Sequence, residues 1–219
     1  MTPDKSVPVP MPALVLAAGN SSRLGRPKQT LLYEGETLLH RAVRTALAAG
    51  CAPVLIVSGA LDAELRAAVA DLPCQFVHNP VWATGLGSSV AAGADALLAW
   101  AATAPNPPAA LLLLLCDQPL LTADHLKALI ARQRATGSAA VASAYAGVAG
   151  VPVVFGAALF DRLRRLDGVG GAGQLLKSLP PAELLTLDFP AAALDVDTPA
   201  QYAQLLAINK LGLTQRLVS

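Results

Sequence analysis

Short runs of apolar residues alternate with helix-like segments along most of this chain, and this alternation constrains the fold more than any other feature. The runs have the length of single strands, and the segments between them repeat apolar residues every three or four positions. Such alternation is typical of an α/β sheet whose strands are joined by crossover helices. We therefore expect a three-layer α/β/α fold with a mostly parallel sheet. The clearest expected strands are residues 13–17, 54–57, 75–78, 111–116 and 139–145.

Capping residues indicate where the helices begin and end. Gly50 stands where a C-cap glycine would end a helix over 38–47. Thr122 is a good N-cap for a helix that reaches about residue 134, and Gly137 would end it. Two further helix starts are expected at Asp62 and at Ser88.

The composition favours one folded domain. The chain has 219 residues, of which 54% are hydrophobic and 14% charged, and this excludes an intrinsically disordered protein. We expect a single domain over 13–208, a flexible N-terminal segment over 1–12 and a C-terminal tail over 209–219. The net charge of +1 argues against a nucleic-acid partner bound through a broad basic surface. Any cationic chemistry must therefore be local.

A mean hydropathy of +0.50 raises the question of a membrane protein. The strongest apolar run, residues 109–116, has eight residues, whereas a spanning helix needs about 20. The first 12 residues hold four prolines and no long apolar stretch, so they match neither a signal peptide nor a transit peptide. We expect a cytoplasmic protein with no membrane partner. Cys51, Cys74 and Cys116 have no paired spacing and are expected to be reduced, buried thiols.

The first loop, residues 16–28, is the most informative stretch for chemistry. An apolar strand runs directly into small residues, so that main-chain N–H groups can approach an anion closely, and cations follow. This pattern outlines a phosphate-binding loop, although it matches neither a Walker A loop nor the dinucleotide fingerprint. A strand-to-helix turn with solvated cations is the alternative. The residues concerned are Leu16, Ala17, Ala18, Gly19, Arg23, Arg26 and Lys28.

Carboxylates follow two extended segments. Asp117 comes directly after the apolar run 111–116, where open α/β sheets place ligands. Alternation puts Asp195 and Asp197 on one face of a later segment. A strand-end carboxylate suits Mg²⁺, which binds one or two carboxylates together with water and substrate phosphates. The structural alternatives are a turn role for Asp117 and, for Asp197, a favourable charge at the start of the last helix.

That last helix has an explicit start, since Thr198 and Gln201 form a capping box with Pro199 at the first helical position. An earlier segment, residues 79–89, combines Asn79 with a glycine-containing loop and serines before a helix. Gly85 permits tight passage of the main chain, and Ser88 offers a hydroxyl beside unpaired helix N–H groups. Such a wall is suited to reading a nucleobase edge, although a serine cap after a glycine loop is common in any helix.

The run from Leu16 to Lys28 resembles the signature L-A-A-G-x-S-x-R-x-G-x-x-K of nucleotidyltransferases similar to the molybdenum cofactor cytidylyltransferases and the molybdopterin-guanine dinucleotide synthases. Asp117 opens a segment that resembles the family's D-Q-P motif, and Asp197 lies in one that resembles its D-[IV]-D-T-P run. Asn79 begins a segment that resembles the element lining the base pocket. The matches span most of the chain and keep the family's order, which implies a Rossmann-like nucleotidyltransferase fold.

The resemblance implies transfer of a nucleoside monophosphate from a nucleoside triphosphate to a phosphorylated acceptor, with release of pyrophosphate. It assigns Arg23 to the β- and γ-phosphates and Lys28 to the α-phosphate. Mg²⁺ is expected on Asp117 and Asp197, with Asp195 in reserve. Residues 16–19 together with Asn79, Gly85 and Ser88 are expected to hold the base and ribose.

The identity of the two substrates is less constrained. Ala18 makes the run L-A-A-G, which resembles the cytidylyl branch, so CTP and a molybdopterin acceptor are the first choice. Val169 and Gly173 stand where the family usually has charged residues, which leaves the acceptor open. The alternatives are guanylyl transfer, another phosphorylated acceptor such as a sugar phosphate, and a non-catalytic nucleotide- or pterin-binding accessory protein. Transient contact with a molybdoenzyme or its chaperone would be consistent with either class.

Overall fold

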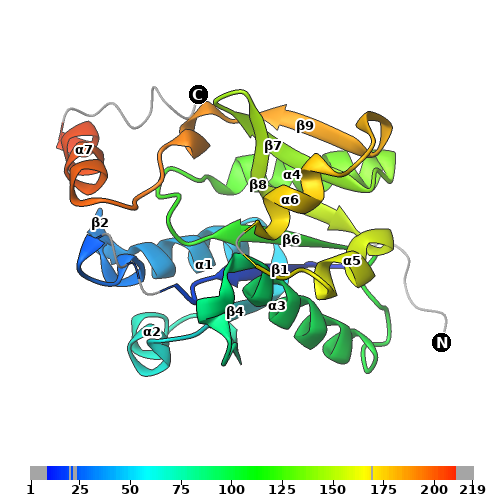
Figure 1. Cartoon of the computed structure of the whole chain (residues 1–219), viewed down its shortest axis with the longest axis horizontal. Coiled ribbons are helices and arrows are strands. Elements are labelled where there is room, and N and C mark those ends of the chain that lie inside the picture. Colours follow the sequence, from blue (N-terminus) through cyan, green and yellow to red (C-terminus); the bar gives the residue numbers. More distant parts are fainter. Residues whose placement is uncertain (1–8, 20, 22–23, 169, 211–219) are drawn as a thin grey trace.

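The computed structural model describes residues 9–19, 21, 24–168 and 170–210, so Arg23 and Val169 lie outside the described residues. Within these ranges seven strands form one sheet in the order β5-β4-β1-β6-β8-β7-β9 (Figure 1). Two short strands, β2 (Leu32–Tyr33) and β3 (Glu36–Thr37), pair separately. The strands of the main sheet are β1 (Met11–Leu16), β4 (Cys51–Ser58), β5 (Gln75–His78), β6 (Ala110–Leu115), β7 (Ala140–Tyr145), β8 (Val148–Gly156) and β9 (Leu184–Asp188).

The sheet is mostly parallel, which confirms the expected fold class. Strands β5, β4, β1 and β6 run parallel to one another, and β7 pairs in parallel with β9. Strand β8 is antiparallel to both β6 and β7. A two-residue turn at Ala146 and Gly147 joins β7 to β8, and both residues have positive φ (48° and 76°), as tight hairpin turns require. Strand β1 begins at Met11, two residues before the expected domain boundary at 13, and ends at Leu16.

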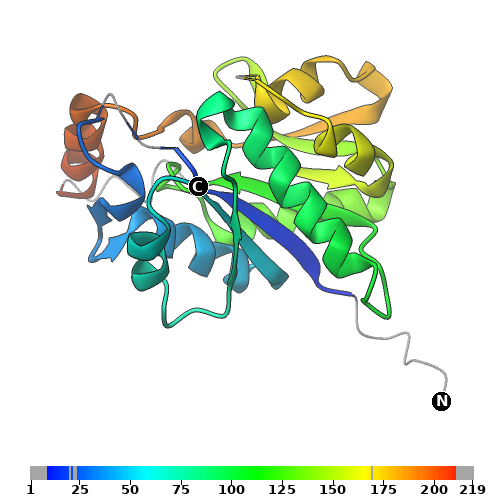
Figure 2. The ribbon, with the colours of Figure 1, turned by 60° about the horizontal axis from the view of Figure 1, so that its bottom comes forward.

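Helices cover both faces of the sheet, which gives the expected three layers (Figures 1 and 2). Helices α1 and α4 contact strands on one face, while α3 and α6 contact the other and α5 packs against α3. Figure 2 shows α3 running alongside β1. The α-helices are α1 (Leu38–Ala48), α2 (Asp62–Ala68), α3 (Leu86–Ala101), α4 (Ala123–Thr136), α5 (Phe160–Arg164), α6 (Gly171–Lys177) and α7 (Pro199–Lys210). Short 3-10 helices are Lys28–Thr30, Trp82–Thr84, Ala157–Leu159, Pro181–Glu183 and Pro190–Ala193.

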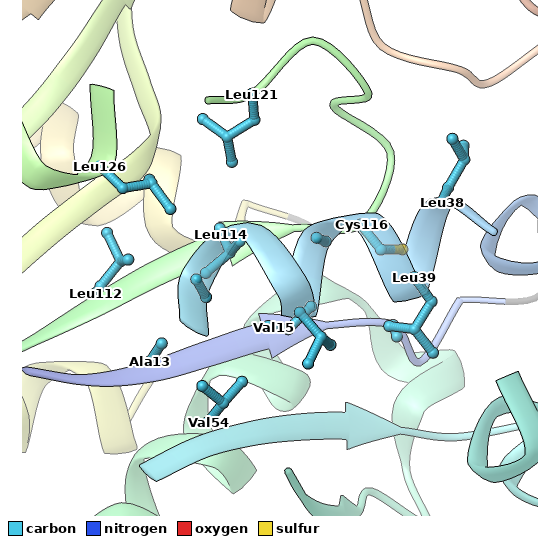
Figure 3. Packing of buried hydrophobic residues seen from close by; sticks show 14 of the residues in the cluster. Ala13, Val15, Leu38, Leu39, Val54, Leu112, Leu114, Cys116, Leu121 and Leu126 are labelled. Atoms are coloured by element: carbon cyan, nitrogen blue, oxygen red, sulfur yellow. The ribbon is translucent and has the colours of Figure 1, made fainter. Parts of the chain in front are cut away.

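Alternate residues of the central strands supply two hydrophobic clusters, one on each face of the sheet. In β1, Val15 belongs to the cluster beneath α1 and α4, whereas Leu14 belongs to the cluster beneath α3. Figure 3 shows Leu112 and Leu114 of β6 in the first cluster, with Leu39 of α1. Because both faces are buried, the strands read as continuous apolar runs. This packing fixes the carboxyl ends of β1 and β6 side by side.

Most expected caps are confirmed, and two helix starts are wrong. Thr122 accepts a hydrogen bond from the His125 N–H at 3.2 Å, and Gly137 ends α4 in the left-handed region. Asp62 is the first residue of α2 and not its cap, because its carboxylate is bound by Ser58 Oγ and by Arg66 Nε. The same helix ends at Ala68.

Helix α3 begins at Leu86 and not at Ser88. Gly85 is its N-cap, with φ of 129°, a main-chain conformation that side chains disfavour. The Ser88 hydroxyl donates to the Gly85 carbonyl at 2.8 Å, inside the first turn. The cysteines are free thiols: Cys51 and Cys116 are buried as expected, whereas Cys74 is only half-buried. None of the described helices is long and apolar enough to cross a membrane.

Candidate active site

A cavity of about 660 Å³ opens at the carboxyl ends of β1 and β6. The chain from β1 leads away to β4 on one side of β1, whereas β6 lies on the other side, so the strand order reverses at this point. Such switch points are where open α/β sheets bind ligands. The lining residues are Leu16, Ala17, Ala18, Gly19, Ser21, Lys28, Gln29, Trp82, Ala83, Gly85, Leu86, Ser89, Leu115, Cys116, Asp117, Asp195 and Asp197.

Lys28 lies between two of the expected aspartates. Its Nζ donates a short hydrogen bond to Asp117 Oδ2 and another of 2.8 Å to Asp197 Oδ1. Burial alone favours the neutral amine, but the charge of Asp117 and the two carboxylate hydrogen bonds outweigh it and raise the pKa of Lys28. The ammonium is therefore charged at any physiological pH. Its single positive charge is shared between two carboxylates that lie far apart in the sequence.

Asp117 retains a second oxygen for a ligand. The residue is 6% exposed, and its Oδ1 is buried with no hydrogen-bond partner among the described residues. An unpaired buried carboxylate oxygen is costly, so a cation or a donor from a bound substrate would be favoured there. Carboxylate oxygens are also the ligands that Mg²⁺ and Mn²⁺ prefer. The residues present therefore fit a divalent cation held by two carboxylates and completed by substrate.

Asp195 is the third carboxylate on the cavity wall. Its Oδ1 accepts a hydrogen bond of 2.9 Å from Gln201 Nε2. Burial raises the pKa of Asp195, and the charges of Asp197 and Asp117 raise it further. Within the described ranges, no group of three or more histidine, cysteine or acidic side chains is arranged to hold a metal ion. Two protein carboxylates suffice for Mg²⁺, because it usually keeps several waters and substrate oxygens.

Gln29 shapes the loop that precedes Lys28, and sequence analysis missed it. Its side chain is buried, and Nε2 donates to the carbonyls of Ala17 and Gly19 at 2.7 and 2.6 Å. The Ser21 hydroxyl accepts from the main-chain N–H of Lys28 at 3.0 Å. These bonds tie the end of β1 to the segment that carries Lys28. In the sequence the signal was only a polar residue directly after the lysine, in a segment already rich in polar residues.

The segment 79–89 forms another wall, but its residues divide between lining and support. Gly85 lines the cavity, as does Trp82, which sequence analysis did not single out. Asn79 does not line it; this residue is 1% exposed, and its Nδ2 donates to the hydroxyls of Ser88 and Ser89 at 3.0 and 3.1 Å. Ser89 lines the cavity and Ser88 does not. Asn79 and Ser88 thus support this wall through hydrogen bonds without lining the cavity themselves.

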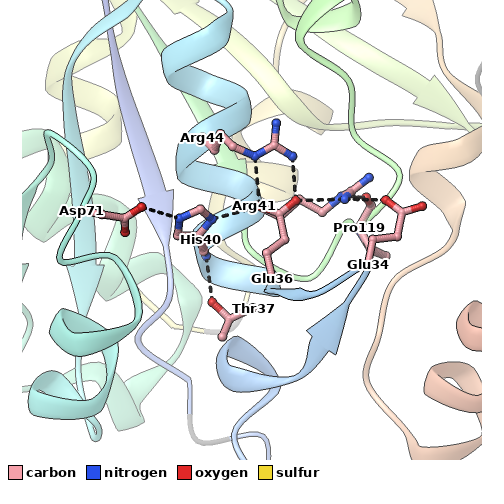
Figure 4. Close-up of polar contacts among 8 residues, drawn as sticks. All are labelled: Glu34, Glu36, Thr37, His40, Arg41, Arg44, Asp71 and Pro119. Atoms are coloured by element: carbon pink, nitrogen blue, oxygen red, sulfur yellow. Dashed lines mark hydrogen bonds and ion pairs between the residues drawn. The ribbon is translucent and has the colours of Figure 1, made fainter.

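A charged network on α1 holds the loop after Asp117 (Figure 4). Arg41 Nε donates to the Pro119 carbonyl at 2.6 Å, and its Nη1 pairs with Glu34 and Glu36 at 2.8 and 3.1 Å. The Arg44 hydrogen bonds, which outweigh the cost of burial, lower the pKa of Glu36 to about 2. Because Pro119 follows Asp117 by two residues, Arg41 restrains the position of that carboxylate. Gln118 adds to this by donating from Nε2 to the Val151 carbonyl at 2.9 Å.

The histidines lie outside the cavity lining. His40 belongs to the same α1 network, between Glu36 and Asp71 at 2.9 and 3.1 Å. His125 stacks on Phe189 with 4.1 Å between ring centroids.

Comparison with known proteins identifies the family. A family model described as a MobA-like NTP transferase domain matches residues 13–183. This chain belongs to the MobA-like NTP transferase family. The match covers the first loop, Lys28 and Asp117, and it confirms the resemblance on which the expected fold and nucleotidyltransferase class rest.

Relatives of this MobA-like chain carry different names. Nicotine blue oxidoreductase of Paenarthrobacter nicotinovorans is 37% identical over 202 residues, which cover 88% of this chain and 95% of that protein. Purine catabolism protein PucB of Bacillus subtilis (strain 168) is 32% identical over 201 residues, which cover 85% of this chain and 91% of that protein. Molybdenum cofactor cytidylyltransferase of Escherichia coli (strain K12) is 35% identical over 85 residues, which cover 38% of this chain and 44% of that protein.

A solved structure shares the same fold. The crystal structure of Rv0371C from Mycobacterium tuberculosis H37Rv, a complex with manganese, superposes with a TM-score of 0.71. It is 29% identical, and the match covers 91% of this chain and 99% of that one. The fold of this MobA-like chain is therefore shared across almost the whole of that protein.

Proposed function

We propose that this protein transfers CMP from CTP to a phosphorylated acceptor, with molybdopterin as the first choice, and releases pyrophosphate. One observation carries the proposal: a lysine held between two aspartates at the switch point of the sheet, in a cavity of about 660 Å³. A triphosphate brings negative charge that matches the ammonium, and a buried carboxylate oxygen remains for a cation. Membership of the MobA-like NTP transferase family supports the reaction class.

Lys28 would bind the α-phosphate, where charge develops as the bond to pyrophosphate breaks. Its side chain is 19% exposed, so its charge acts in a partly desolvated site where electrostatic stabilisation is strong. Arg23, which lies outside the described residues, is assigned to the β- and γ-phosphates by the family motif. Asp117 and Asp197 would hold a divalent cation, Mg²⁺ or Mn²⁺. When bound, that cation neutralises phosphate charge and orients the phosphates for in-line attack.

The base and ribose would occupy the cavity between the end of β1 and the wall at 82–89. Ala18 and Gly19 offer main-chain groups, and Gln29 holds that main chain in shape. Trp82, whose side chain is aromatic, also lines this cavity. We assign Asn79 and Ser88 an indirect role, because they bond to the wall and do not line the cavity.

The acceptor is the less constrained half of the proposal. Molybdopterin is supported by the relative named molybdenum cofactor cytidylyltransferase, which matches 38% of this chain. The relative named nicotine blue oxidoreductase matches 88% of it, and this favours an oxidoreductase activity as a second candidate. The two candidates differ in whether a triphosphate or a redox cofactor enters the cavity.

Pyrophosphate release and thermal shift, measured with CTP, GTP, ATP and UTP and with Mg²⁺ or Mn²⁺, test the proposal. A ligand that binds the folded state raises the melting temperature. We expect CTP with a divalent cation to give the largest shift, and molybdopterin to be needed for pyrophosphate release. Asp117→Asn should abolish release, whereas Asp124→Asn, in an exposed ion pair on α4, should leave it unchanged. A shift with NADPH and none with any triphosphate would favour the oxidoreductase and reject the transferase.

A further inference from the structure

The side chain of Gln201, in the first turn of α7, contacts both aspartates of the segment Asp195-Val196-Asp197, called the D-V-D segment below. Its Nε2 donates to Asp195 Oδ1 at 2.9 Å. Its Oε1 accepts from the main-chain N–H of Asp197 at 3.0 Å and from the Thr198 hydroxyl at 3.0 Å. The Gln201 main-chain N–H in turn donates to Thr198 Oγ1 at 3.3 Å. A residue of the helix cap is thus bonded to two residues of the cavity wall.

We propose that Gln201 is a positioning residue that decides which aspartate joins Asp117 at the cation site. It holds the Asp195 carboxylate to one side and fixes the main chain of Asp197, so that Asp197 provides the second carboxylate. This inference rests on the proposed function, because it concerns the divalent cation of that site.

The hydrogen bonds of Lys28 support this division. Among the described residues, its Nζ bonds to Asp117 and Asp197, and not to Asp195. Asp117, Asp195 and Asp197 all line the same cavity. Without a restraint, two equivalent carboxylates two residues apart would compete for one cation. The Gln201 amide biases the competition, because it holds one oxygen of Asp195 and also bonds to the main-chain N–H of Asp197.

An amide is suited to this task because it donates from one atom and accepts at the other. At position 201 the donor faces a carboxylate and the acceptor faces an N–H and a hydroxyl. Hydrogen bonds to ligating carboxylates commonly set their orientation, and their loss typically lowers metal affinity or activity by about 10–100-fold. The same range is expected when the Gln201 side chain is removed.

The test measures direct Mn²⁺ binding by electron paramagnetic resonance, with and without a non-hydrolysable CTP analogue. Asp195→Asn and Asp197→Asn are each prepared with Gln201 intact and with Gln201→Ala. With Gln201 intact, Asp197→Asn should weaken Mn²⁺ binding at least about 10-fold more than Asp195→Asn does. In the Gln201→Ala background the two losses should become similar, because Asp195 is then free to replace Asp197. A double-mutant comparison of this kind isolates the coupling between neighbouring side chains.

Gln204→Ala is the matched control, since Gln204 lies one turn further along α7 and is exposed; it should preserve the difference between the aspartates. Circular dichroism and thermal unfolding establish that each variant is folded. Equal losses with Gln201 intact, a difference that persists without it, or a wild-type protein that binds no Mn²⁺ in either condition would overturn the inference. If the difference is found but no triphosphate is consumed, the positioning role stands and the transferase proposal fails.

Discussion

Replacing Lys28 by methionine tests whether its ammonium stands in the position of a cation. Removing one partner of a buried ion pair costs about 3–5 kcal/mol. Because the side chains of Lys28 and Asp197 are 19% and 25% exposed, solvent screening reduces this cost, and we expect about 2–3 kcal/mol. For a chain of this size that corresponds to a fall in melting temperature of about 4–12 °C.

The informative readout is the response to a divalent cation. In the wild-type protein the ammonium competes with a cation for Asp117 and Asp197, whereas in Lys28→Met the two carboxylates lack that positive charge. We therefore expect millimolar Mn²⁺ to raise the melting temperature of Lys28→Met more than that of the wild type, relative to EDTA. Lys127→Met, in an exposed pair with Asp124, should change stability by less than about 1 kcal/mol without added cation dependence. An equal or larger response in the wild type would refute the reasoning.

Two further predictions concern stability. Burial lowers the pKa of His125 to about 4, below the unfolded value of about 6.5, so the unfolded state binds more protons between these values and stability should fall as pH drops from 6.5 to 4. For this half-buried ring the loss by pH 5 should be on the order of 1 kcal/mol in urea unfolding, and a His125→Phe variant with the same pH dependence as the wild type would contradict it. Gly59→Ala should cost about 1–3 kcal/mol, because a Cβ there would lie 2.6 Å from the Ala18 carbonyl and from the Trp82 ring. Gly173→Ala is the control in chemical denaturation, since nothing lies within 4 Å of its added Cβ; equal effects of the two would show that the cavity wall tolerates the extra atom.

The strands could be predicted from sequence because each is buried on both faces. Leu14 and Val15 belong to clusters on opposite sides of the sheet, so the apolar run is continuous and its length alone identifies a strand. The start of α3 could not be predicted in this way. Serine is a common N-cap, but here the Gly87 N–H donates to the Gly168 carbonyl at 2.9 Å. That long-range contact satisfies a helix N–H that a local cap would otherwise serve, and the helix begins earlier.

In the site, too, local sequence patterns predict some residues, whereas others depend on contacts between distant parts of the chain. Lys28 is 89 residues from Asp117 and 169 from Asp197, and no local pattern connects them. The rule that ligands bind where parallel strands end predicted Asp117 at the cavity, and the family motifs supplied Lys28 and Asp197. The amides that hold these groups, Gln29 and Gln201, carry no charge and no motif role beyond a helix cap. Their contribution depends on hydrogen bonds that form only in the folded chain.

Helix α7 links the parts of the site that are furthest apart in sequence. Its first turn carries Gln201, which bonds to the D-V-D segment, and Tyr202, whose hydroxyl donates to the Leu32 carbonyl at 2.8 Å. The Arg26 guanidinium lies 5.1 Å from the centre of the Tyr202 ring, a cation–π distance. One helical turn therefore contacts both the loop that carries Lys28 and the segment that carries Asp197. Since Lys28 joins that loop to Asp117 as well, the carboxylates and the lysine are held in register by contacts from both ends of the chain.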